Sequence, residues 1–383
     1  MKIEMTAYFD NSATTAVCRR AADAALNAMT SVFGNPSSLH SVGYEAERIV
    51  SDARQRIASA LGCDAEELVF TSGGTEANNL AILSAARLNS RRGRHILSTA
   101  VEHPSVLAVL DALEKEGFEV TLLRPDRENG VTPAQIEENL RPETVLVSMM
   151  LVNNEIGMRF PVEHIRRIIS KVGSPALLHC DAVQTFGHLP LSVRRLGADL
   201  VSISGHKLHA PKGIGALYVK KGVRISPMIL GGGQERGLRS GTENVPGIAA
   251  FGAAVEEATD CLDSSRARIA SLRRTLLEAL SSLPGACVNS PADGADHILN
   301  FSVEGLRSET VMHFLAGAGV CVSAGAACAS RKGGSHVLRA MGLKDSLIES
   351  ALRVSFSRFN TDDELDRLIS ALRTAVKTLT RAR

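Results

Sequence analysis

The most regular feature of the chain is an alternation of short apolar runs with amphipathic stretches. Apolar runs typical of buried strands occur at residues 68–72, 95–98, 119–123, 145–151, 176–180, 200–203 and 216–219. Stretches with the helical spacing of apolar residues lie between most of them, and Pro104, Pro133 and Pro161 mark three helix starts. Such alternation predicts a mostly parallel sheet with helices on both faces.

Further helices and strands are predicted on either side of this region. Helical patterns at 18–31 and 46–61 precede it, and a long helical stretch at 247–283 follows it. The last part of the chain then shows strands at 298–303, 320–322 and 352–356, helices at 309–316 and before Met341, and a final helix that opens with a capping box at Thr361 and Glu364. Because 383 residues exceed one ordinary core, we expect a large domain followed by a smaller one.

Composition narrows the class of protein. A net charge of +2 gives no electrostatic basis for binding nucleic acid, and 4% of aromatic residues argues against a base-stacking surface. The first residues lack the apolar region of a secretory signal, and no apolar stretch is long enough to span a membrane. Seven scattered cysteines without a CxxC pair are typical of a reducing compartment and predict neither disulfides nor a metal site. The expectation is a cytoplasmic α/β protein without nucleic-acid or membrane partners.

A lysine and a carboxylate follow two of the strand-like runs. One run ends at Ser204 and is followed by His206 and Lys207, and another ends before Asp181, with Gln184 just behind. In open α/β sheets, ligands bind at the carboxyl ends of the strands. A lysine that forms a Schiff base and a carboxylate that pairs with a pyridinium nitrogen are the protein groups that pyridoxal 5′-phosphate (PLP) needs most. For Lys207 alone, a surface lysine after an ordinary strand is the alternative.

A glycine turn connects the first strand-like run to a helix. Gly73 and Gly74 lie between the run at 68–72 and a helical pattern at 77–88. Free backbone N–H groups and the positive end of a helix dipole then meet at one point, which favours a phosphate group. The same turn is also a plain helix start with Thr75 as N-cap. This turn, together with the pairing of Lys207 with Asp181, favours a PLP lysine over a surface lysine at position 207.

Three other residues are candidates for chemistry. Cys328 lies among small residues that cannot pack a core, so it is either a reactive thiolate or a bystander in an exposed loop. His103 follows a strand at a helix start and either faces the same crevice as Asp181 or only begins the helix. Arg353 lies in an apolar strand and either reaches outward or clamps a carboxylate.

Together these segments resemble the cysteine desulfurases of the NifS/IscS type, PLP enzymes of the class V aminotransferase group. The match covers nearly the whole chain, with the motifs in the family's order and spacing. It rests on residues 71–79, 102–103, 152–157, 181–184, 204–207 and 239–242, the Cys328 loop and the segment around Arg353.

The resemblance implies an aspartate-aminotransferase-like fold (fold type I). This fold has a large domain with a mostly parallel seven-stranded sheet and a smaller α/β C-terminal domain. Residues 1–15 would pack with the small domain, residues 16–255 would form the PLP-binding domain, and residues 256–383 would form the small domain that carries the cysteine loop.

The resemblance also implies a role for each motif. The catalytic residues would be Lys207, which holds PLP, Cys328 as nucleophile, and His103, which stacks on the cofactor and handles protons. The other residues implied to contact PLP are Gly74, Thr75, Asn154, Asp181, Gln184, Ser204, His206 and Thr242. Thr242 would reach the neighbouring subunit of an obligate homodimer. The substrate carboxylate would be bound by Asn35, Asn154 and Arg353.

The implied reaction removes sulfur from L-cysteine. It would leave L-alanine and a persulfide on Cys328, which passes to an acceptor such as an iron–sulfur scaffold protein or a thiotransferase. Residues 329–334 differ from the family's usual sequence, so the acceptor stays open. One alternative is a selenocysteine lyase or another class V PLP enzyme, for which no reactive cysteine is needed. The other is a catalytically silent scaffold, in which Lys207, Asp181 or Cys328 should have been lost.

Overall fold

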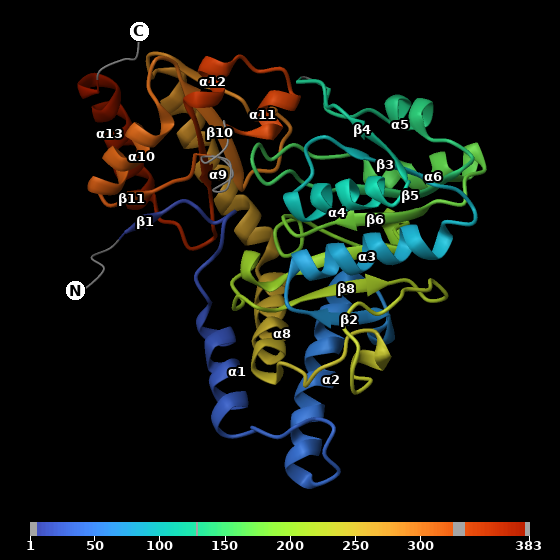
Figure 1. The fold of residues 1–383 in the computed structure, drawn as a ribbon. Helices are drawn as coiled ribbons and strands as arrows, with labels where there is room; N and C mark the ends of the chain where they lie inside the picture. Colours follow the sequence, from blue (N-terminus) through green and yellow to red (C-terminus); the bar gives the residue numbers. More distant parts are fainter. Residues whose placement is uncertain (1–5, 128, 325–333, 380–383) are drawn as a thin grey trace.

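A seven-stranded sheet forms the centre of the larger part of the molecule. The computed structural model describes residues 6–127, 129–324 and 334–379, and Figure 1 shows this sheet beside a smaller C-terminal unit. The strand order is β2-β8-β7-β6-β5-β3-β4. The strands are β2 (Leu68–Thr71), β3 (His95–Thr99), β4 (Glu119–Leu123), β5 (Thr144–Met150), β6 (Leu177–Asp181), β7 (Leu200–Ser204) and β8 (Gly215–Val219). β8 is antiparallel to both its neighbours and every other pair is parallel, which confirms the predicted mostly parallel sheet.

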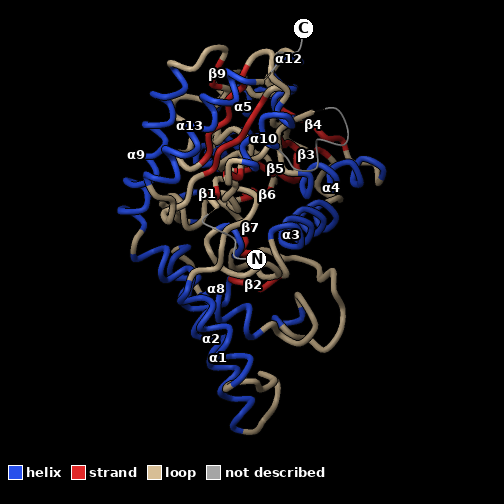
Figure 2. The backbone as a smooth tube through the Cα atoms, turned by 90° about the vertical axis from the view of Figure 1, so that its left-hand side faces the viewer, coloured by secondary structure: helices blue, strands red, loops and turns tan. Residues whose placement is uncertain are grey.

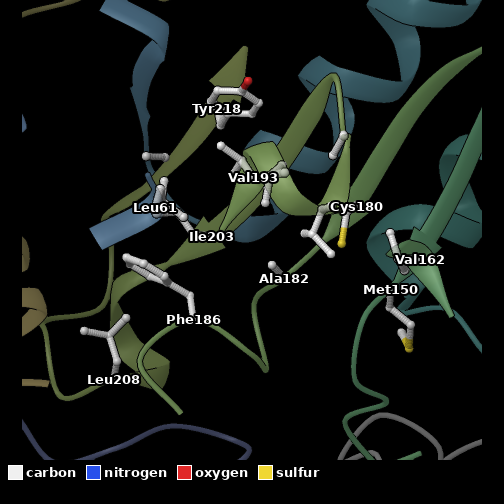
Figure 3. Close-up of a cluster of buried hydrophobic side chains, with 14 of the residues drawn as sticks. Leu61, Met150, Val162, Cys180, Ala182, Phe186, Val193, Ile203, Leu208 and Tyr218 are labelled. Atoms are coloured by element: carbon white, nitrogen blue, oxygen red, sulfur yellow. The ribbon is translucent and has the colours of Figure 1, made fainter. Parts of the chain in front are cut away.

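Helices cover both faces because successive strand residues point to opposite sides. Leu200 packs with α3 and α4 on one face, whereas Val201 packs with α2, α6 and α8 on the other. Figure 3 shows part of the second cluster, with Leu61 of α2 near Ile203 of β7. The helices are α1 (Arg19–Thr30), α2 (Ser41–Leu61), α3 (Gly74–Asn89), α4 (Pro104–Lys115), α5 (Pro133–Asn139), α6 (Val162–Val172), α7 (Val193–Leu196) and α8 (Val245–Asp260), with short 3-10 turns η1 (Ala65–Glu67), η2 (Gly205–Lys207) and η3 (Glu235–Gly237). In Figure 2, α1, α2 and α8 extend together away from the sheet.

The C-terminal unit has its own hydrophobic core. An antiparallel sheet of order β12-β10-β9 lies against α9, α10 and α13. The elements are α9 (Leu262–Ser281), β9 (Ala286–Val288), β10 (Ile298–Val303), α10 (Ser308–Gly317), β11 (Val320–Cys321), α11 (His336–Ala340), α12 (Asp345–Glu349), β12 (Ala351–Ser355) and α13 (Asp362–Thr378). The N-terminal strand β1 (Ala7–Tyr8) pairs with β11, and Phe9 is buried in this same core. The start of the described chain therefore packs with its C-terminal unit.

Several predicted boundaries are wrong. The helical stretch at 247–283 is two helices, because the backbone at Cys261 leaves helical geometry with ψ of +14°. The N-cap of α3 is Gly73 rather than Thr75, since the turn needs a φ of +154°, which favours glycine. The short strands β1 and β9 were not predicted. Within the described ranges, no helix combines the length and apolar character needed to cross a membrane.

Candidate active site

One cavity of about 330 Å³ brings most of the predicted site residues together. It lies where β5, β6 and β7 end and where α3 and α4 begin. This is the edge at which an open α/β sheet binds its ligands. The sequence-predicted residues that line it are Gly74, Thr75, His103, Asn154, Asp181, Gln184, Ser204, His206, Lys207 and Arg353.

Lys207 follows β7 in the short turn η2, and its amine is held by main-chain oxygens. The Nζ atom donates to the carbonyl of Ser12 at 2.5 Å and to that of Ala13 at 2.8 Å. Burial, helped by the nearby positive charge of Arg353, lowers the pKa of Lys207 to about 8. An amine with this pKa is partly neutral at physiological pH and can act as a nucleophile or a base.

Asp181 is the last residue of β6 and is held in place from two sides. Its Oδ2 accepts a hydrogen bond from Asn78 Nδ2 at 2.7 Å, and its Oδ1 accepts one from the Val183 N–H at 3.0 Å. The side chain is 7% exposed. A fixed, buried carboxylate beside the lysine suits a positively charged ring nitrogen.

The start of α3 and the end of β7 form a polar cradle. Gly73 supplies the turn, and the first N–H groups of α3 have no partners within the helix. Beside them, the Ser204 hydroxyl is buried and has no hydrogen-bond partner among the described residues. A Cβ on Gly74 would lie 2.7 Å from the Val183 side chain, so only glycine fits at this position without a clash. An unpaired buried hydroxyl next to free helix N–H groups fits the phosphate of PLP.

His103 combines the two roles considered for it. It is the N-cap of α4, where its Nδ1 accepts a hydrogen bond from the Ser105 N–H at 3.1 Å, and it also lines the cavity. Burial lowers the pKa of the imidazole. Because Nδ1 is an acceptor, the proton of the neutral ring is on Nε2.

Arg353 does not reach outward to solvent. It is 3% exposed in β12, and its guanidinium donates to Asp10 Oδ1 at 2.7 Å and to the Asn154 carbonyl at 2.8 Å. Its Nε–H is buried without a partner among the described residues. A buried guanidinium that lines the cavity and keeps one N–H unpaired suits a carboxylate ligand.

Two other predicted site residues do not line this cavity, and a third lies outside the described residues. Asn35 is exposed in the loop between α1 and α2, where its Oδ1 accepts from the Ser37 N–H at 3.0 Å. Thr242 is exposed and lines a separate cavity of about 210 Å³ with Glu235 and Arg239. Cys328 lies outside the described residues.

Three contributors to the site were missed by sequence reasoning. Asp10 binds Arg353, the Ser12 carbonyl binds Lys207, and Asn78 binds Asp181. Asp10 and Ser12 lie in a short polar segment without periodicity, and Asn78 is a polar residue on the buried face of α3. Two features of the sequence could have indicated these residues. They are the polar character of residues 10–15 and the amide of Asn78 at a core position of a helix.

Glu102, next to His103, provides a test of the local electrostatics. It is fully buried between the Thr99 hydroxyl and the Met150 N–H, and burial raises its pKa to about 8. Between pH 4.5 and 8 the unfolded chain ionises this group while the folded chain keeps it protonated, so wild-type stability falls with rising pH in this window.

Glu102→Gln removes this titration while keeping an acceptor oxygen. Relative to wild type, its free energy of unfolding should therefore rise by about 3 kcal/mol between pH 5 and pH 8, measured by urea denaturation. The exposed Glu114→Gln protein is the matched control and should show no such trend. A difference between Glu102→Gln and wild type that stays constant with pH would show that Glu102 is ionised in the fold.

Comparisons with known proteins agree on one family. The family model described as Aminotransferase class-V matches residues 7–368. The chain is 41% identical to the cysteine desulfurase IscS of Methanosarcina thermophila over 97% of this chain and 92% of that protein. It is 42% identical to the cysteine desulfurase IscS of Anaeromyxobacter dehalogenans over 96% and 91%. Among solved structures, a NifS-like protein superposes with a TM-score of 0.93 at 38% identity, covering 98% of this chain and all of that one. SspA in complex with cysteine superposes with a TM-score of 0.82 at 32% identity, covering 93% of this chain and all of that one.

Proposed function

Because the chain belongs to the class-V aminotransferase family, whose members depend on PLP, we propose that it is a cysteine desulfurase with its active site in the cavity around Lys207. The observation that carries the proposal is the meeting of Lys207, Asp181 and Arg353 in one cavity with the polar cradle at Ser204. Similarity to relatives named as cysteine desulfurases, and to a structure solved with cysteine, supports this substrate.

The residues that line the cavity suggest how each part of PLP would be held. Asp181 would pair with the ring nitrogen, and Gln184, whose amide donates to the Ser12 carbonyl at 3.1 Å, would contact the ring oxygen. Gly74, Thr75, Ser204 and His206 line the cradle and would hold the phosphate. When bound, PLP supplies an electron sink for bond changes at the α-carbon of an amino acid.

The protein groups then move protons and sulfur. Arg353 and Asn154 orient the substrate carboxylate, and Lys207, with its lowered pKa, takes the α-proton. The Cys328 thiolate bonds to the substrate sulfur while the bond from that sulfur to carbon breaks. The carbon part, once protonated, leaves as L-alanine, and the sulfur stays on Cys328 as a persulfide for transfer to an acceptor. His103, neutral and protonated on Nε2, is the proposed proton carrier.

The direct test uses purified protein with PLP, L-cysteine and a reductant. Alanine and sulfide are measured together, and equal amounts of both are expected. Absence of both products in PLP-loaded protein would contradict the proposed function. Release of alanine from selenocysteine alone would identify a selenocysteine lyase.

We further propose a homodimer, in which Thr242 completes the phosphate site of the partner subunit. Thr242 is exposed and separate from the cavity of its own chain. Large apolar side chains are also exposed in two regions, one around α1 and α2 and one in the loop after β8. They are Leu26, Met29, Phe33, Leu39 and Tyr44 in the first, and Met228, Ile229 and Leu230 in the second.

Mixing a variant with weakened PLP binding and an inactive variant tests this arrangement. Thr242→Ala should weaken PLP binding about 10-fold through loss of one hydrogen bond to phosphate, and Lys207→Ala should be inactive. After subunit exchange, a mixed dimer holds one site with an intact Lys207 and the Thr242 of the other chain, so about a quarter of the sites should be functional. Activity is measured at limiting PLP, with each variant incubated alone as control. No recovery on mixing would place Thr242 outside the partner's site.

The proposed sulfur acceptor is an iron–sulfur scaffold protein or a thiotransferase, and the proposed location is the cytoplasm. In support of that location, the six described cysteines are all free thiols.

A further inference from the structure

Two histidines form a stacked pair behind the cavity. The His188 and His297 rings are parallel within 8°, with centroids 4.5 Å apart. His188 ends the turn that follows Gln184, and His297 comes directly before β10. Neither ring lines the cavity, and neither belongs to the motifs that carry the family resemblance. The pair joins the large sheet domain to the C-terminal unit.

Each ring is bonded to the main chain of a residue in the proposed cofactor site. His188 Nε2 lies 2.8 Å from the carbonyl oxygen of Lys207, and His297 hydrogen-bonds the main chain of Gln184. A carbonyl oxygen can only accept, so the proton of His188 is on Nε2. The carbonyl of Lys207 is thereby fixed through one imidazole.

Both rings are neutral in this environment. Burial, together with the positive charges of Arg358 and Lys207, holds the pKa of His188 at about 4, and burial also lowers the pKa of His297 well below its usual value. A neutral imidazole has one N–H, and in His188 it is committed to Lys207. The remaining nitrogen of His297, Nε2, is buried without a partner among the described residues. Such an unpaired nitrogen is costly, so stacking and the bond to Gln184 must hold this ring in place.

We propose that His188 and His297 are positioning residues, which fix the main chain at Lys207 and Gln184 and connect both to the C-terminal unit. The inference rests on the proposed function in one respect, namely that Lys207 and Gln184 contact PLP. His297 is attached to the C-terminal unit by the Phe356 N–H, which donates to its carbonyl oxygen at 2.9 Å. A displacement of β10 or β12 would therefore move the main chain at Lys207 and Gln184 through the stacked rings.

The test uses the apoprotein and measures two quantities by absorbance. They are the dissociation constant of PLP and the rate at which Lys207 captures PLP covalently. His188→Leu leaves the Lys207 carbonyl without its donor, so the PLP dissociation constant should rise on the order of 10-fold. His188→Gln places an amide N–H at a similar reach and should restore the affinity to within about 3-fold. His297→Phe keeps a ring for stacking but loses the bond to Gln184, and should weaken PLP binding about 5-fold. KM for L-cysteine should stay unchanged in all three because neither ring lines the cavity.

His95→Leu is the matched control. His95 is buried and bonds Thr144 and Thr121, but it begins β3, at the opposite end of the strands from the cavity. It should lower the melting temperature and leave PLP affinity unchanged. If His188→Leu does not fold, His188→Asn, whose amide is too short to reach the carbonyl, replaces it with the same expected loss.

The outcomes separate this inference from the proposed function. Equal PLP affinity in His188→Leu (or His188→Asn), His188→Gln and wild type would overturn the positioning role. A loss of PLP affinity that follows the loss of melting temperature in every variant, the His95→Leu control included, would also overturn it. The wild type could produce no sulfide while the variants still show the expected differences in PLP affinity. That result would contradict the desulfurase activity and support the positioning role of the two histidines.

Discussion

Lys207→Ala is expected to reduce alanine and sulfide production on the order of 10³-fold or more. The substitution removes both the amine that links to PLP and the base that takes the substrate proton. Borohydride reduction of the PLP-loaded wild type, followed by peptide mass analysis, should find the label on the peptide that contains Lys207. The exposed Lys221→Ala protein is the control and should match wild type in both measurements. A label on any other lysine would contradict the assignment.

The pH dependence of PLP capture provides a second measurement for Lys207. Burial lowers the pKa of its amine to about 8, and only the neutral amine attacks the aldehyde of PLP. The rate at which the apoprotein captures PLP should therefore rise with pH and level off above about pH 8. An amine with an ordinary lysine pKa would give a rate that still rises above about pH 10.

Cys328→Ser is expected to reduce sulfide and alanine production by about 10³-fold while PLP binding stays normal. A serine hydroxyl remains protonated at neutral pH and cannot accept sulfur to form a persulfide, whereas a cysteine thiolate can. Cys321→Ser is the matched control because Cys321 is half-buried in β11 and bonded into the sheet by its backbone. It should retain nearly full activity. Unchanged alanine and sulfide production in Cys328→Ser would mean that Cys328 is not the sulfur acceptor and that the added reductant takes the sulfur from the substrate directly.

The sequence predicted those site residues whose positions follow from local patterns. Asp181 and Lys207 come after apolar runs, so the strand ends could be located and their meeting at one sheet edge inferred. Gly73 and Gly74 mark a turn for the same reason. The partner of Arg353 could not be predicted, because Asp10 lies 343 residues away in the chain. Local periodicity gives no information about such long-range pairs, and Asp10 lies in a segment without helical or strand periodicity.

The break between α8 and α9 and the stacked histidines were also beyond prediction. Apolar residues continue on both sides of Cys261, so one long helix and two shorter ones share the same pattern. His188 and His297 lie in polar loops 109 positions apart, and only the packing of the C-terminal unit on the large domain brings their rings together. In both cases tertiary contacts, rather than local preference, determine the outcome.

The position of the first described residues has a consequence for the timing of synthesis. The N–H of Ser12 donates to the Ser355 hydroxyl at 2.8 Å, and Asp10 binds Arg353, so residues 10–12 are held by β12. The same segment supplies the carbonyl groups that hold the Lys207 amine. A ribosome-bound chain in which β12 has not yet emerged therefore lacks one wall of the cavity, although Lys207 and Asp181 were made long before. Cofactor loading must wait for release of nearly the full chain, and a truncated translation product would keep its lysine but not the site.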